Sequence, residues 1–240
     1  MEWHEAINAI SPYVVRIATP QGAGTGWMVS RSNTSKLCAV ATAAHVIDHA
    51  HYWEEPLRLM HPASGKSVLL RDTERAVHLD PDLDSAAIVF NLSELPLPDE
   101  PPKLVKKDKF IKPGVEVGWL GFPAIPQADI CFFSGRISSY LERISAYLVD
   151  GVAINGVSGG PAIRLLLDSF EVMGILSAYV PNRATGESLP GVAVIREAIH
   201  FHGVTERFRS FDEAKKEETP PTPPVAVEPQ TAESPAKSPR

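Results

Sequence analysis

Residues 155–161 read Asn-Gly-Val-Ser-Gly-Gly-Pro, a glycine-rich heptapeptide with a single serine at position 158. Glycines on both sides of Ser158 allow a sharp backbone turn that presents the hydroxyl unobstructed. They also leave backbone N–H groups free to bind a developing oxyanion. The alternative interpretation of this stretch is a glycine-rich β-turn in which the serine has no chemical role. Because a serine hydroxyl alone is a weak nucleophile, the stretch indicates chemistry only if the chain also supplies a base and an orienting acid.

Both groups occur upstream of the heptapeptide. Residues 41–46, ATAAHV, place His45 at the end of a Val/Ala strand, where a short helical turn is predicted to begin. Residues 82–89, DLDSAAIV, place Asp82 and Asp84 at the mouth of another strand. Taken singly, a histidine at a strand end is usually structural, and an aspartate before a strand is usually a turn former. Their occurrence together with Ser158 favours a nucleophilic site.

The hydrophobic pattern around these motifs is that of an all-β chain. Short runs rich in Val and Ile, separated by turn residues, recur along most of the sequence and predict an antiparallel sandwich or barrel. The expected strands cover residues 13–18, 26–30, 37–41, 67–70, 86–90, 115–120, 130–133, 146–149, 172–177 and 192–195. Helices are expected only near residues 2–10 and 196–202.

Two proline-rich segments divide the chain. Residues 91–114 hold five prolines and a run of lysines, and they read as a solvated linker between a first barrel (about 12–90) and a second barrel (about 115–203). Seven prolines fall in residues 220–240. We therefore expect a folded domain over residues 1–210 and a disordered Pro-rich tail over 211–240. The P-x-x-P patterns of the tail are candidate ligands for a protein partner that binds polyproline helices.

Composition excludes several classes of function. The net charge of −6 and the pI near 5.8 offer no basic surface for nucleic acid. No apolar window is long enough to span a membrane, and the first ten residues lack a secretory signal, so a cytoplasmic location is expected unless a leader has been removed. Cys38 and Cys131 lie in apolar runs and are expected to be reduced. The sequence indicates no cofactor, and its two H-x-H pairs lack a third metal ligand.

With these motifs in view, the chain resembles the trypsin-like (chymotrypsin-fold) serine peptidases, above all compact bacterial members such as the HtrA-type enzymes. Thr-Ala-Ala-His at 42–45, Asp-Ser-Ala at 84–86 and Gly-Val-Ser-Gly-Gly-Pro at 156–161 stand in the family order of histidine, aspartate and serine. Residues 24–27, 118–123 and 174–177 match further family segments. The resemblance covers about residues 12–203 and implies two six-stranded-type antiparallel barrels, without a PDZ module.

The resemblance also implies roles for individual residues. His45, Asp84 and Ser158 would form the catalytic triad of a serine-type endopeptidase that cleaves polypeptide substrates, with Asp82 as the rival acid. The N–H groups of Gly156 and Ser158 would form the oxyanion hole. Substrate contacts are expected from Ser177, Ala178, Tyr179 and Val152.

Three positions depart from the digestive members of the family. Val157 replaces the acid that pairs with a newly cut N-terminus, which makes activation by that ion pair unexpected. Val46 replaces a cysteine that often follows the histidine. Val152 stands where trypsins carry an aspartate, so a small or apolar P1 residue is expected in place of Lys or Arg.

Two other interpretations remain open at this point. Residues 156–160 also fit the Gly-x-Ser-x-Gly elbow of α/β-hydrolases, for which Asp168 with His200 or His202 would complete an esterase triad. That fold requires alternating strands and helices. The same double barrel could also act without catalysis, as a peptide-binding or partner-activated module.

Overall fold

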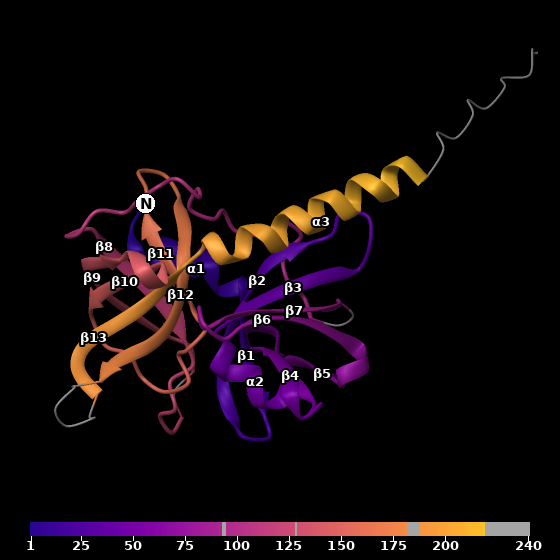
Figure 1. The fold of residues 1–240 in the computed structure, drawn as a ribbon, viewed down its shortest axis with the longest axis horizontal. Coiled ribbons are helices and arrows are strands. Elements are labelled where there is room, and N and C mark those ends of the chain that lie inside the picture. The colour runs from indigo at the N-terminus through magenta and orange to yellow at the C-terminus, as the bar shows by residue number, and fades with distance from the viewer. Residues whose placement is uncertain (93–94, 128, 182–187, 219–240) are drawn as a thin grey trace, which may run out of the picture.

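Thirteen strands and three α-helices form the described part of this computed structural model, which comprises residues 1–92, 95–127, 129–181 and 188–218; for 178–181 and 188–190 only the backbone is described. The strands form two antiparallel sheets that lie side by side (Figure 1). Each sheet is assembled largely from strands that follow one another in the sequence, as expected of an all-β chain with short turns.

The N-terminal sheet has seven strands in the order β5-β4-β1-β2-β3-β7-β6. Its two outermost strands, β5 and β6, are edges, so the sheet curves without closing. The strands are β1 (Val14–Thr19), β2 (Gly22–Arg31), β3 (Leu37–Thr42), β4 (Leu57–His61), β5 (Lys66–Leu70), β6 (Arg75–Asp80) and β7 (Ser85–Asn91).

The C-terminal sheet closes into a six-stranded barrel in the order β10-β13-β12-β11-β8-β9. Its strands are β8 (Glu116–Gly121), β9 (Cys131–Leu141), β10 (Ala146–Asp150), β11 (Pro161–Leu165), β12 (Phe170–Pro181) and β13 (Ser188–Glu197). The predicted all-β fold class is thus confirmed, with one difference in detail: the first half is an open seven-stranded sheet, and only the second half is a closed barrel.

Helices occupy both ends of the described chain and one connection. They are α1 (Trp3–Ile10), α2 (Ala44–Tyr52) and α3 (Ile199–Glu218), and single 3-10 turns cover Ser11–Tyr13, Pro62–Ser64, Asp72–Glu74 and Glu142–Ile144. The helix expected near residues 2–10 is confirmed. The C-terminal helix is far longer than the predicted 196–202, and residues 211–218, expected to be disordered, are its last two turns. Residues 219–240, the rest of the predicted tail, lie outside the described residues.

Helix α3 continues past residue 210 because the N-terminal sheet holds it. Phe201, Val204 and Phe208 are buried at helical spacing, and the helix runs across β2 (Figure 1). One turn further on, Asp212 is only 7% exposed. Its carboxylate accepts hydrogen bonds from the Ser32 hydroxyl at 2.5 Å, the Asn33 N–H at 2.8 Å and the Thr34 hydroxyl at 2.7 Å. These bonds tie the far half of α3 to the β2–β3 loop.

Buried apolar side chains gather inside each sheet and at the seam between the sheets. The seam group contains Trp27 and Leu120, one from each sheet, together with Phe122 and Phe201. Because both sheets and two helices bury side chains in one group, the two halves pack as one unit about the seam. Both cysteines are free; Cys38 is buried in the first sheet, which raises the pKa of its thiol to about 12.

Candidate active site

His45 occupies the junction between a buried strand and a surface helix. β3 ends at Thr42, α2 begins at Ala44, and His45 is the second residue of the helix. Ala43 and Ala44 are still buried, whereas the His45 side chain is 48% exposed. The change from strand to helix therefore delivers the imidazole to the surface at the point where the two sheets meet.

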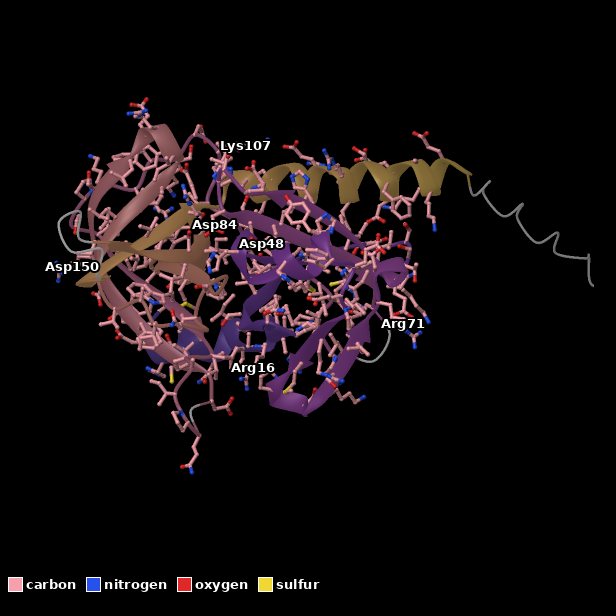
Figure 2. The ribbon with its side chains drawn as sticks, turned by 60° about the horizontal axis from the view of Figure 1, so that its bottom comes forward. Arg16, Asp48, Arg71, Asp84, Lys107 and Asp150 are labelled. Atoms are coloured by element: carbon pink, nitrogen blue, oxygen red, sulfur yellow. The ribbon has the colours of Figure 1, made fainter. Side chains whose placement is uncertain are left out.

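Asp84 ends the turn that joins β6 to β7, and its N–H donates to the Pro81 carbonyl at 3.2 Å. Its φ of +45° lies in the left-handed region, which aspartate tolerates better than most residues. Oδ1 of Asp84 accepts the backbone N–H of His45 at 3.0 Å, and His45 Nδ1 lies 2.9 Å from Oδ1 and 3.0 Å from Oδ2. The Ser177 hydroxyl donates to Oδ2. Asp84 lies at the junction of the sheets, far from Asp150 and Arg71 on the outer flanks (Figure 2).

Asp82, the rival acid, lies two residues earlier in the same turn. It is exposed, and among the described residues it forms no hydrogen bond or ion pair with His45. Asp84, by contrast, has a side chain that is only 16% exposed. The geometry therefore pairs His45 with Asp84.

The electrostatics of the pair favour a charged carboxylate beside a basic imidazole. Burial opposes protonation of His45, but the hydrogen bond and charge of Asp84, aided by the charge of Asp48, raise its pKa above the usual value. Burial alone would raise the pKa of Asp84. The hydrogen bonds from His45 and Ser177 and the charge of His45 outweigh burial, and the pKa of Asp84 is lowered.

The loop that carries Ser158 belongs to the C-terminal barrel but is held by the N-terminal sheet. The N–H of Thr25 donates to the carbonyl of Ser158 at 2.8 Å. The Thr25 hydroxyl donates to the Gly156 carbonyl at 2.8 Å and accepts from the Phe122 N–H at 3.0 Å. Thr42 donates in turn to the carbonyl of Thr25 at 2.7 Å. Thr25 is buried, and these bonds fix Ser158 relative to the strand that ends before His45.

Glycine is required at two positions of this loop. Gly156 has a φ of +90° and Gly159 a φ of +85°, which side chains rarely adopt. A Cβ on Gly159 would lie 2.2 Å from both the Thr25 carbonyl oxygen and the Thr42 hydroxyl oxygen. The close approach between the loop and the first sheet is thus possible only without a side chain.

Two N–H groups of the loop have no acceptor in the part of the chain that the structure describes. The N–H groups of Val157, Gly159 and Gly160 donate to backbone carbonyls. Within the described residues, the N–H groups of Gly156 and Ser158 donate to none. One belongs to Ser158 itself and the other to the residue two positions before it, and an oxyanion hole requires such unoccupied donors.

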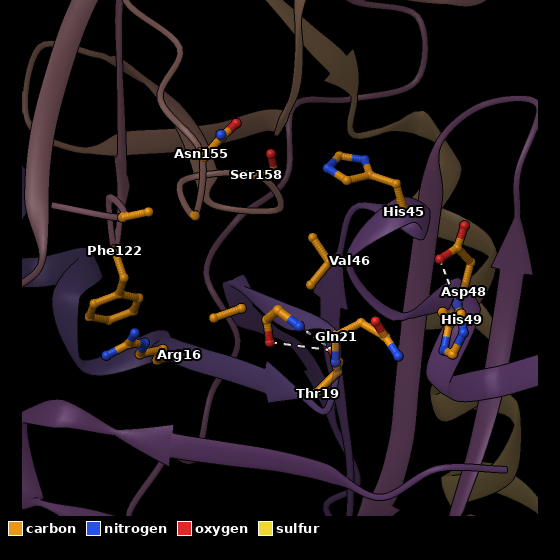
Figure 3. A pocket seen from close by; sticks show the side chains of 14 residues that line it. Arg16, Thr19, Gln21, His45, Val46, Asp48, His49, Phe122, Asn155 and Ser158 are labelled. Carbon is orange, nitrogen blue, oxygen red and sulfur yellow. Dashed lines mark hydrogen bonds between the residues drawn. The ribbon is translucent and has the colours of Figure 1, made fainter. Parts of the chain in front are cut away.

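His45 and Ser158 line the same cleft, whose volume is about 420 Å³ (Figure 3). The cleft lies at the junction of the sheets, between the β1–β2 hairpin, the first turn of α2 and the loop over residues 155–158. The hydrogen bonds formed among the described residues do not include one between the Ser158 hydroxyl and His45. In a free enzyme such a bond is often long and shortens only when substrate is bound.

Other residues singled out in the sequence lie elsewhere. The Ser177 hydroxyl, expected at the substrate, is buried against Asp84, and Val152 is 50% exposed and does not line the cleft. The side chains of Ala178 and Tyr179 lie outside the described residues. Asp168 is exposed in the turn between β11 and β12, and His202 Nε2 bonds to the Val105 carbonyl. The antiparallel barrel and these positions exclude the α/β-hydrolase interpretation.

Several cleft residues were not identified from the sequence. Arg16 and Phe122 line the cleft, and Asp48 lines it on the side of α2 (Figure 3). Asp48 follows His45 by three residues, so one helical face could have suggested it. Arg16 precedes the first motif by several residues, and only the pairing of β1 with β2 brings it to the site.

In the described part of the chain, no group of three or more His, Cys, Asp or Glu side chains could hold a metal ion. No helix among the described residues combines the length and apolar composition needed to cross a membrane.

Comparison with solved structures places this fold. The chain is similar to the crystal structure of a serine endoprotease from Yersinia pestis, with a TM-score of 0.63 and 20% identity over 87% of this chain. It spans 66% of that protein's chain. It also resembles Rv3671c from Mycobacterium tuberculosis in an inactive form with a serine-to-alanine mutation (TM-score 0.55, 20% identity, 91% of this chain and 93% of the other).

A second inactive form, of the Rv3671c protease, matches with a TM-score of 0.58 and 20% identity over 85% of this chain and 92% of the other. No protein-family model and no curated protein sequence matches the chain. These likenesses show that the chain has the fold of trypsin-like serine peptidases, as the sequence motifs predict.

Proposed function

We propose that the chain is a serine endopeptidase in which Ser158 is the nucleophile, His45 the general base and acid, and Asp84 the orienting carboxylate. The observation that carries this proposal is the double contact of Asp84 with His45. Because the carboxylate occupies Nδ1 of the imidazole, the other nitrogen, Nε2, is left to exchange a proton with Ser158.

The reaction follows from these positions. Ser158 Oγ attacks the scissile carbonyl carbon while His45 Nε2 takes the hydroxyl proton. The resulting oxyanion is held by the N–H groups of Gly156 and Ser158, each donor being worth about 3 kcal/mol in sites of this kind. The C–N bond then breaks as His45 returns the proton to the leaving amine. Water, activated by His45, releases the acyl group from Ser158. Asp84 stays ionised throughout and stabilises the imidazolium.

Peptide hydrolysis is supported because His45, Gly156 and Ser158 line one cleft, while Asp84 contacts His45 Nδ1. We further propose a small or apolar residue at P1; this rests on the family resemblance alone, in which Val152 replaces an aspartate, because Val152 does not line the described cleft. Hydrolysis of a quenched fluorescent peptide library by the full chain tests both points. Ser158→Ala and His45→Ala should each abolish turnover, and His78→Ala, an exposed histidine on β6, should leave it unchanged. Full turnover in Ser158→Ala would refute the proposal.

One observation favours a second candidate, a scaffold of the same fold that is inactive or needs an activating partner. The Ser158–His45 hydrogen bond is not among those formed in the described residues. If this candidate is correct, the chain binds library peptides without cleaving them, and Ser158→Ala binds them with unchanged affinity. Cleavage by the purified wild-type chain alone would exclude it.

A further inference from the structure

Arg16 is a cation in the candidate active-site cleft without a partner among the described residues. It lines the cleft and is exposed, and in the described part of the chain no hydrogen bond or ion pair engages its guanidinium. Four other described arginines form ion pairs, for example Arg164 with Glu171 and Arg31 with Asp99. An unpaired arginine in a cleft is a ready donor for a carboxylate of a ligand.

The strand register explains why Arg16 faces the cleft. Arg16 lies directly opposite Thr25 in the antiparallel pairing of β1 with β2, and opposite residues project their side chains from the same face of a sheet. The Thr25 side chain points toward Gly156 and Phe122, to which it is hydrogen-bonded. The Arg16 side chain therefore leaves the sheet on that same face, and Arg16 and Phe122 line the same cleft (Figure 3).

The chemistry assigns the cleft wall formed by the β1–β2 hairpin and α2 to the leaving half of the substrate, and Arg16 lies on β1 of that hairpin. His45 must give its proton to the leaving amine, so the leaving segment lies on the His45 side of Ser158. The cleft wall on that side is built from the β1–β2 hairpin and α2, with Thr19, Gln21 and Asp48 among its residues. Ser177, on the strand expected to contact the acyl half, is turned toward Asp84.

The negative charge of Asp48 and the positive charge of Arg16 lie at different places along this wall. Asp48 is the one carboxylate among the described cleft residues, and its Oδ1 accepts the N–H of His49 at 2.5 Å on α2. Arg16 lies on the other side of Gln21 from Asp48 in Figure 3, and Phe122 and Asn155, which line the cleft with it, are uncharged. A negative group of the leaving segment is repelled by Asp48 and attracted to Arg16.

We propose that Arg16 is a specificity-determining residue that binds a carboxylate in the leaving half of the substrate, either an acidic side chain or the C-terminal carboxylate. This inference rests on the proposed function, since it takes Ser158 and His45 as the reacting groups. A guanidinium can donate two parallel hydrogen bonds to a carboxylate, and the partial enclosure of the cleft limits screening by solvent. We expect an effect of roughly fivefold to twentyfold on kcat/KM.

The test uses quenched fluorescent peptides that differ only in the second and third residues after the scissile bond. In the first set, all peptides are amidated at the C-terminus and the two varied positions carry Glu, Gln or Lys. In the second set, a short Gln peptide is compared with a free and with an amidated C-terminus. If Arg16 binds an acidic side chain, the kcat/KM of wild type should be highest for the Glu peptide, lower for Gln and lowest for Lys. If it binds the C-terminal carboxylate, kcat/KM should be higher for the free than for the amidated peptide. Arg16→Gln should abolish the preference, and Arg16→Glu should favour Lys. Arg58→Gln, an exposed arginine on the neighbouring β4, is the matched control and should behave as wild type.

Equal kcat/KM for all peptides in wild type would overturn this inference while leaving the proposed peptidase intact. The same peptides are also titrated against Ser158→Ala by fluorescence anisotropy, which reports binding without turnover. If no peptide is cleaved, the proposed function fails, and the binding titration still decides on Arg16. Tighter binding of carboxylate peptides that is lost in the Ser158→Ala, Arg16→Gln double variant supports the site, and equal affinities refute it.

Discussion

The carboxylate of Asp84 contacts His45 both at its backbone N–H, 3.0 Å from Oδ1, and at its ring Nδ1, 2.9 Å from the same oxygen. The first contact fixes the start of α2, and the second sets which ring nitrogen faces the cleft. Asp84 itself is held in a left-handed conformation by the turn before β7. One side chain therefore links the junction of β3 and α2 to the chemistry proposed for Ser158.

This pairing predicts the pH dependence of activity. Although burial opposes protonation, Asp84 raises the pKa of His45 above its ordinary value of 6.5, and the proposed base works only when unprotonated. As the pH falls, kcat/KM should therefore decline with an apparent pKa above 6.5. Asp84→Asn should lower kcat by roughly 10⁴-fold. A pH–rate profile of the purified chain gives the apparent pKa of this decline in kcat/KM, and a value at or below 6.5 would contradict the pairing.

Ser177 should act as a positioning residue rather than as a substrate contact. Ser177→Ala removes the donor to Asp84 Oδ2, a bond to a charged group worth about 1.5 kcal/mol, so kcat should fall roughly tenfold with little change in KM. The apparent pKa on the acid side of the pH–rate profile should rise, because Asp84 without this hydrogen bond binds the His45 imidazolium more strongly. Ser30→Ala, a buried serine on β2, is the control. A rise in KM at constant kcat would instead assign Ser177 to the substrate.

Two glycine-to-alanine variants should have opposite effects on stability. Gly159→Ala places a Cβ against Thr25 and Thr42 at positive φ, and we expect a loss of more than about 2 kcal/mol in the free energy of unfolding. Gly203 lies inside α3, and a Cβ there meets no atom within 4 Å. Gly203→Ala should gain about 0.5–1 kcal/mol by helix propensity. Urea titrations of both variants give their free energies of unfolding. An unchanged value for Gly159→Ala would contradict the close approach described for this loop.

The Asp212 contacts predict that α3 contributes to stability in a pH-dependent way. Asp212→Ala leaves the loop donors of Ser32, Asn33 and Thr34 without their acceptor and should cost about 2–3 kcal/mol. Although burial raises the pKa of Asp212, the hydrogen bonds outweigh it and hold the pKa below the ordinary value of 3.8. The contribution is therefore complete at neutral pH and is lost as the pH falls through the pKa of the folded state.

Urea midpoints measured between pH 7 and pH 3 test this linkage. The difference between wild type and Asp212→Ala should shrink in acid, while Glu213→Ala, a change at the exposed neighbour, should follow wild type throughout. A difference that stays constant with pH would show that the carboxylate charge does not matter.

Among the strands that the sequence predicted correctly, β3 and β7 are short, mostly buried and apolar. β4, β6 and β11 were not predicted. β11 begins at Pro161, directly after the glycine-rich loop, and proline is rare inside strands. β4 and β6 alternate apolar with polar or charged residues near the edges of the sheet. The last turns of α3 were missed for a similar reason. Their local composition is polar, and their contacts with the β2–β3 loop come from residues 180 positions away.

The residues of the candidate site could be predicted more readily because each lies in a short motif. The motifs single out His45, Ser158 and the acids at 82 and 84, and the family resemblance favours Asp84 over Asp82. In the folded chain Asp84 contacts His45, and His45 and Ser158 line one cleft. Arg16 and Thr25 could not be assigned roles in this way. Their positions depend on the register of β1 with β2 and on the docking of two sheets, which no local pattern encodes.

The most direct test of the central claim is labelling of the purified full chain with a fluorophosphonate, followed by intact-mass measurement and peptide mapping. If Ser158 is a nucleophile activated by His45, wild type gains a single adduct on Ser158, His45→Ala reacts far more slowly, and Ser158→Ala gains none. A wild-type chain that gains no adduct, or a Ser158→Ala chain that is labelled as fast as wild type, would contradict the account.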